Sequence, residues 1–65
     1  MNNLRYIRRD RDVTQKELAQ IMGVSHQFIG KLEKGKARLN EDHIRVICEA
    51  LNCSADYLLG LIDKE

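Results

Sequence analysis

Apolar residues recur at intervals of three and four along this chain, which is the spacing of helices with one buried face rather than of strands. One stripe at i, i+3, i+4 and i+7 consists of Ile44, Ile47, Cys48 and Leu51. The same spacing returns near the end of the sequence, at Ala55, Leu58, Leu59 and Ile62. The sequence contains no proline that would interrupt these patterns. The pattern predicts an all-α chain whose apolar stripes form a shared core.

Residues that start and stop helices divide the chain into five predicted helices. Thr14 and Glu17 have the spacing of a capping box, in which each side chain bonds a backbone N–H at the helix start. Further N-cap residues are Ser25, Asn40 and Ser54. The helices are expected over residues 3–11, 14–23, 26–34, 41–51 and 55–62.

The second and third predicted helices are separated by only Gly23, Val24 and Ser25, so the chain must turn sharply there. Glycine adopts a positive φ without steric cost, and the small Ala19 allows the two helices to approach closely. The second helix is expected to bury Leu18, Ile21 and Met22. Residues 14–34 therefore have the pattern of a helix-turn-helix, a motif that presents its second helix to the major groove of DNA.

The outward arc of helix 26–34 is polar, basic or very small when Ile29 and Leu32 face the core. It consists of His26, Gln27, Gly30, Lys31 and Lys34. Glutamine can pair with adenine, lysine donates to guanine, and histidine can donate or accept. The sequence therefore predicts that this arc contacts base edges.

Charge is unevenly distributed although the net charge of the 65 residues is only +1. Residues 1–38 hold nine basic and four acidic side chains, whereas residues 39–65 hold two basic and six acidic ones. A basic half fits a polyanionic partner approached from one side, but small charge imbalances are common, and the asymmetry alone does not favour either interpretation.

Three segments carry a resemblance to a known family: residues 14–19 (TQKELA), 23–25 (GVS) and 32–36 (LEKGK). With Leu4, Ile7 and Arg8 before them and residues 57–60 (YLLG) after them, they resemble the Cro/C1-type (Xre family) helix-turn-helix proteins. The resemblance implies a compact five-helix domain, similar to that of lambda repressor, occupying residues 1–65 as a single unit.

The resemblance also implies roles for individual residues. Base edges would be contacted by His26, Gln27 and Lys31. Phosphates would be contacted by Gln15 and by Lys36 and Arg38 of the loop after the third helix. Lys34 lies beside this loop, and the basic cluster as a whole is expected to meet phosphates, the alternative being a solvated face. Arg8 and Glu33 match positions where the family often forms an ion pair between the first and third helices. Gly30 departs from the family pattern, and it either permits close approach to DNA or is simply tolerated.

Other chemistry finds little support in the sequence. Cys48, Cys53, His26 and His43 are residue types that bind zinc, but Cys48 lies in an apolar stripe and no Cys-x-x-Cys pair exists. We expect no metal and no disulfide. Neither serine has a histidine and carboxylate partner set, so we expect no enzyme, no cofactor and no small-molecule substrate.

The function that these features favour is sequence-specific binding of double-stranded DNA by a transcriptional regulator, expected to be a repressor. No segment approaches the ~20 apolar residues that cross a bilayer, so a cytoplasmic location is expected. The alternative is a protein-interaction module that derives from a helix-turn-helix and no longer binds DNA. Salt-dependent binding to duplex DNA would separate the two.

The last predicted helix suggests self-association. If its apolar stripe is buried, Tyr57 and Leu61 remain on a separate face at i and i+4. We expect a homodimer through this helix and the segment before it, with these two residues at the centre of the interface and residues 63–65 at its rim. The dimer is expected to be weak in the absence of DNA and to bind a pseudo-palindromic operator. The alternative is that two exposed apolar side chains are ordinary surface.

Overall fold

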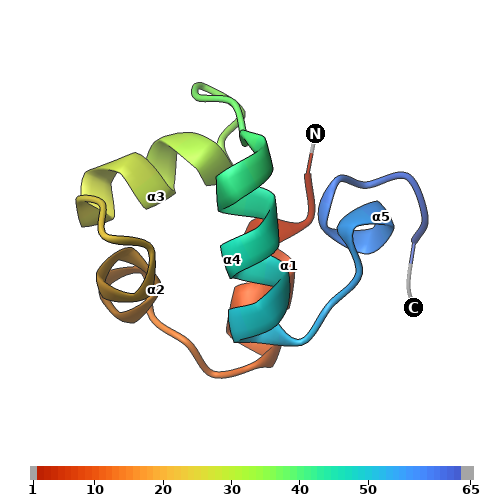
Figure 1. Cartoon of the computed structure of the whole chain (residues 1–65), viewed down its shortest axis with the longest axis horizontal. Helices are drawn as coiled ribbons and strands as arrows, with labels where there is room; N and C mark the ends of the chain where they lie inside the picture. Colours follow the sequence, from red (N-terminus) through yellow and green to blue (C-terminus); the bar gives the residue numbers. More distant parts are fainter. Residues whose placement is uncertain (1, 64–65) are drawn as a thin grey trace.

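Five α-helices surround one apolar cluster in the computed structural model, which describes residues 2–63. They are α1 (Leu4–Asp10), α2 (Gln15–Met22), α3 (His26–Glu33), α4 (Glu41–Leu51) and α5 (Ala55–Leu58) (Figure 1). The part of the chain that the structure describes contains no strand, so the prediction of an all-α, five-helix fold is confirmed.

The helix starts are those that the N-cap residues predict. The hydroxyl of Thr14 accepts from the backbone N–H of Glu17 at 3.0 Å, and the carboxylate of Glu17 accepts from the N–H of Thr14 at 3.0 Å. Asn40 and His43 form the corresponding reciprocal pair at the start of α4. Each cap satisfies backbone N–H groups that have no partner within the helix.

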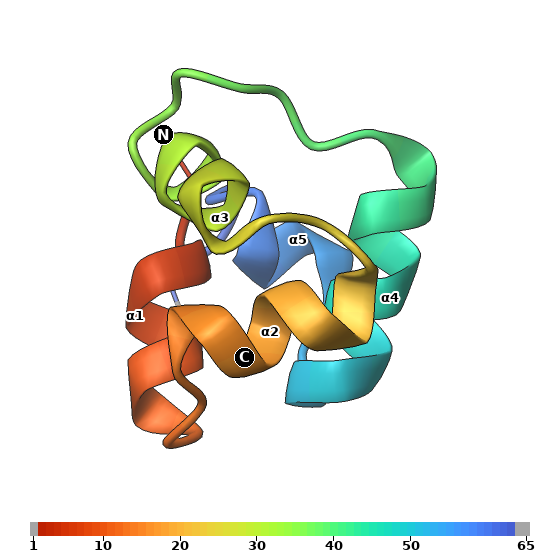
Figure 2. The same ribbon diagram turned by 90° about the vertical axis from the view of Figure 1, so that its left-hand side faces the viewer.

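The core joins residues from every helix, and α2 packs against both α3 and α4. Figure 2 shows α2 lying between α1 and α4, with α3 above it. The fully buried side chains are Leu4, Ile7, Leu18, Ile29, Leu32, Ile47, Leu51 and Leu58. Burial of one such side chain contributes about 1.5 to 3 kcal/mol relative to its exposure, so this cluster fixes how the helices are arranged.

The predicted helix 55–62 is wrong in its length and in its buried face. The structure ends α5 at Leu58, leaves Leu59 37% and Ile62 41% exposed, and buries Tyr57 to 7%. The physical reason is Gly60, which takes a left-handed φ of 81° and closes the helix by donating its N–H to the carbonyl of Tyr57 at 3.1 Å. Asn3 donates its backbone N–H to the carbonyl of Leu58 at 2.9 Å and its side-chain amide to the carbonyl of Tyr57 at 2.8 Å. These two bonds tie the end of α5 to the start of the chain.

Two further sequence expectations are refined by the structure. Ile21 was expected in the inner face of α2, but it is 54% exposed, whereas Leu18 is fully buried. Cys48 and Cys53 are half-buried and pack against the core. Within residues 2–63, no group of three or more His, Cys, Asp or Glu side chains is arranged to hold a metal, and no helix is long and apolar enough to cross a membrane.

Candidate nucleic-acid interface

The corner between α2 and α3 has the geometry that its three residues predict. Gly23 ends α2 in the left-handed region, with φ of 71°. Val24 is half-buried against the core, and its N–H donates to the carbonyl of Ala19 at 3.0 Å. The hydroxyl of Ser25 then caps α3 by accepting from the N–H of Phe28 at 3.2 Å. These contacts fix the direction in which α3 leaves α2.

Helix α3 has one apolar face and one polar face. Ile29 and Leu32 are fully buried, and Glu33 is 9% exposed. The opposite face is open to solvent through His26, Gln27, Lys31 and Lys34, with Gly30 half-buried among them. The outward arc expected from the sequence therefore exists as a surface.

A hollow of about 380 Å³ lies along this polar face. Its lining consists of Gln15, His26, Gln27, Gly30, Lys31, Lys34 and Lys36. The structure thus brings together Gln15 from α2, the polar arc of α3 and Lys36 from the loop that leads to α4. No acidic side chain is among these lining residues, so the hollow is electropositive.

Arg38 is exposed in the same loop but is not among the residues that line the hollow. Figure 2 shows this loop running above α3 toward the start of α4. Arg38 therefore lies outside the hollow along the polar face of α3.

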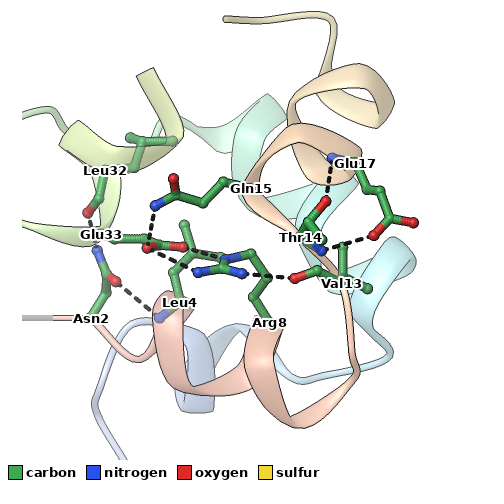
Figure 3. Close-up of polar contacts among 9 residues, drawn as sticks. All are labelled: Asn2, Leu4, Arg8, Val13, Thr14, Gln15, Glu17, Leu32 and Glu33. Atoms are coloured by element: carbon green, nitrogen blue, oxygen red, sulfur yellow. Dashed lines mark hydrogen bonds and ion pairs between the residues drawn. The ribbon is translucent and has the colours of Figure 1, made fainter. Parts of the chain in front are cut away.

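A buried polar network holds α1, α2 and α3 together beneath this surface (Figure 3). The Nε of Arg8 donates to Oε2 of Glu33 at 2.6 Å, and one Nη donates to the carbonyl of Val13 at 2.8 Å. The side chains of Arg8 and Glu33 are only 9% and 3% exposed. The ion pair implied by the family resemblance is thus present, and the charge of Glu33 is neutralised inside the domain.

Gln15 is the third member of this network, which the sequence analysis missed. Its Nε2 donates to Oε1 of Glu33 at 3.0 Å. An amide nitrogen carries two hydrogens, so the same group retains a donor for a further acceptor at the edge of the hollow. No local spacing could have predicted this contact, because it joins residues 18 positions apart through side chains alone.

The two residues expected at a dimer interface do not share a surface. Tyr57 is 7% exposed and belongs to the core, whereas Leu61 is 71% exposed. The expectation was wrong for Tyr57 because α5 ends one turn after it begins, so the assumed i and i+4 face is absent. The exposed apolar residues of this region are Leu59, Leu61 and Ile62. Of the residues expected at the rim of the interface, 64 and 65 lie outside the described part of the chain.

Comparison with known proteins identifies the family. The family described as Helix-turn-helix (HTH_3) matches residues 4–58. The antitoxin PezA of Streptococcus pneumoniae serotype 4 is 31% identical over 58 residues, an alignment that covers 89% of this chain and 37% of PezA. The uncharacterized HTH-type transcriptional regulator y4mF of Sinorhizobium fredii is 34% identical over 55 residues, which cover 85% of this chain and 72% of that protein.

A solved structure resembles most of this chain. The clp gene regulator ClgR of Corynebacterium glutamicum matches with a TM-score of 0.75 and 35% identity, over 80% of this chain and 55% of that chain. This chain therefore spans little more than a third of PezA and about half of the ClgR chain. The α2–α3 corner and these similarities show that the chain belongs to the Cro/C1-type helix-turn-helix family.

Proposed function

We propose that this chain is a sequence-specific repressor that reads the major groove of double-stranded DNA with α3. One observation carries the proposal: the exposed face of α3 is free of acidic residues and lines an electropositive hollow together with Gln15 and Lys36. A regulator of this kind acts where the DNA is, so we place it in the cytoplasm. Residues 1–65 act as one DNA-binding unit, with residues 14–34 as its helix-turn-helix.

Three side chains of α3 read bases in this proposal. Gln27 presents a donor and an acceptor to adenine, Lys31 donates to guanine, and His26 contacts a base at the start of the helix. Their exposure and their place in one hollow support these roles. Because α3 is anchored through Ile29 and Leu32, the readers are held on a rigid element.

Phosphate contacts on either side of the readers orient the domain. Gln15 supplies its remaining amide hydrogen from one side, and Lys34, Lys36 and Arg38 supply positive charge from the other. These contacts carry no sequence information, but they supply salt-dependent affinity.

The regulator acts as a homodimer on a pseudo-palindromic operator, because one domain covers only one half-site. Two-fold symmetry would place two copies of α3 about 34 to 36 Å apart, in successive turns of the major groove. Leu59, Leu61 and Ile62 are the exposed apolar residues near the C-terminal end, and they support an interface there. Three side chains bury far less than the ~1,200 to 2,000 Å² of a stable interface, so the dimer forms fully only on DNA.

Selection of binding sites from random duplexes tests this function. The expected result is one enriched motif with two inverted halves, and an affinity that falls steeply as salt is raised. If no motif is enriched and duplex binding does not depend on salt, the chain is a protein-interaction module and the proposal is wrong. A motif bound equally well by Gln27→Ala would reject α3 as the reader.

A further inference from the structure

A second hollow, of about 690 Å³, lies beside the candidate reading surface. It is bounded by the N-terminal segment, by one side of α1 and by the end of α3, and its lining includes Arg5, Tyr6, Arg9 and Lys34. Lys34 lines both hollows, so the two form a continuous surface. None of the roles proposed above uses Arg5, Tyr6 or Arg9.

The charge of this second hollow is positive. Arg5, Arg9 and Lys34 are exposed, and the two arginines lie four residues apart on one side of α1. Glu33 is the acidic residue in its lining, but both of its carboxylate oxygens are occupied by Arg8 and Gln15. Three cations therefore face the solvent around an acid that is already neutralised.

The position of α1 beside the end of α3 is fixed by hydrogen bonds. Asn2 donates its side-chain amide to the carbonyl of Leu32 at 2.9 Å and accepts from the N–H of Leu4 at 3.0 Å (Figure 3). Asn3 is bonded on the other side to α5 through Leu58. These bonds, with the buried Arg8–Glu33 pair, fix the helix that carries Arg5 and Arg9 relative to the end of α3.

We propose that Arg5 and Arg9 bind phosphates of duplex DNA that lie outside the base pairs read by α3. The proposal rests on the proposed function, because it assumes that α3 enters a major groove. From there the basic surface continues across Lys34 onto α1, where a second stretch of sugar-phosphate backbone meets the two arginines. The hydroxyl of Tyr6, which is 63% exposed, is a further donor to the same phosphates.

The salt dependence of binding tests this proposal with Arg5→Gln and Arg9→Gln. Each variant should reduce the slope of log K against log salt concentration by about one unit on both selected and random duplexes, or roughly eightfold in affinity near 0.1 M salt. Arg45→Gln is the matched control because it removes the same charge from α4, where Arg45 lies next to Glu41 and Asp42 at 3.3 and 3.4 Å. Its slope should equal that of the wild type.

Duplex length supplies a second readout. On a duplex with one half-site, progressive shortening of both flanks should lower the affinity of the wild type. The affinity of the double variant Arg5→Gln/Arg9→Gln should depend much less on the length of the flanks. If the double variant matches Arg45→Gln in slope and in flank dependence while Gln27→Ala loses the selected site, only this inference is overturned. If the wild type binds no duplex, the proposed function fails first and the inference fails with it.

Discussion

Arg8 and Glu33 form an ion pair at 2.6 Å that is almost completely removed from solvent, although the two residues belong to helices separated by the whole of α2. A buried charge that loses its partner is left uncompensated, which typically costs about 3 to 5 kcal/mol. We expect Glu33→Ala to lower the free energy of unfolding by an amount in that range. Urea denaturation followed by circular dichroism measures it.

The double variant Arg8→Met/Glu33→Leu provides the comparison for this pair. Because it removes both charges and retains volume, we expect it to be more stable than either Arg8→Met or Glu33→Leu alone. If the loss of unfolding free energy in the double variant equals the sum of the losses in the two single variants, the residues do not stabilise the domain as a pair.

Base reading and phosphate binding predict different losses. Gln27→Ala and Lys31→Ala should each lose about 1 to 3 kcal/mol on the selected site and relax the preference at one base position. Lys36→Ala should weaken binding to all sequences and reduce the salt slope by about one unit. Titration of fluorescent duplexes at several salt concentrations measures both quantities. Equal losses on selected and random DNA for all three variants would contradict the assignment.

Substitution by alanine should change the stability of the fold in opposite directions at Gly30, which lies within α3, and at Gly35, which follows it. At Gly30 an added Cβ would lie 3.9 Å from Nε2 of Gln15, an ordinary contact, so Gly30→Ala should stabilise the helix by about 0.5 to 1 kcal/mol. Gly35 has φ of 75° and open space around it, so Gly35→Ala should destabilise by about 1 to 2 kcal/mol through backbone strain alone. Thermal or urea unfolding compares them directly, and a loss of stability in Gly30→Ala would show that the α2–α3 packing cannot accommodate a methyl group.

The capping box of α2 gives a pH dependence. The pKa of Glu17 is lowered because its carboxylate accepts hydrogen bonds from Thr14, first from the backbone N–H and second from the side-chain hydroxyl. The carboxylate of Glu17 therefore binds a proton less readily in the folded chain than in the unfolded chain. The stabilisation is therefore complete above the ordinary glutamate pKa of about 4.3 and is lost as pH falls through the lower folded value.

Glu17→Gln isolates this contribution, since every other carboxyl group is unchanged. We expect the difference in unfolding free energy between the wild type and Glu17→Gln to shrink as pH is lowered from 6 toward 3. A difference that is independent of pH would mean that the ionised form of Glu17 does not contribute to the cap.

Dimer formation on DNA should depend on the exposed apolar residues after α5. Leu61→Lys places a charge on a side chain that is 71% exposed, so the fold should survive while cooperative binding of the second half-site is lost. Sedimentation with and without the selected duplex measures the number of chains bound. One chain per two-half-site duplex in the wild type, or an unchanged dimer in Leu61→Lys, would reject this interface.

The sequence by itself determined the features that depend on neighbouring residues. Helix starts at Thr14, Ser25, Asn40 and Ser54 follow from local hydrogen bonds between a cap and the residue three positions later. The polar face of α3 follows from helical periodicity once Ile29 and Leu32 are buried. The family resemblance added the Arg8–Glu33 contact, which local spacing could not predict.

Only the tertiary structure decided which face of α5 is buried and which groups surround Glu33. Periodicity placed Leu59 and Ile62 in the core and Tyr57 outside, whereas in the structure Tyr57 is buried and the end of its helix is bonded to Asn3 near the start of the chain. The same holds for Gln15, whose amide meets Glu33 only because α2 and α3 pack together. Hydrogen bonds between residues far apart in the chain depend on the packing of whole helices, and no local pattern encodes them.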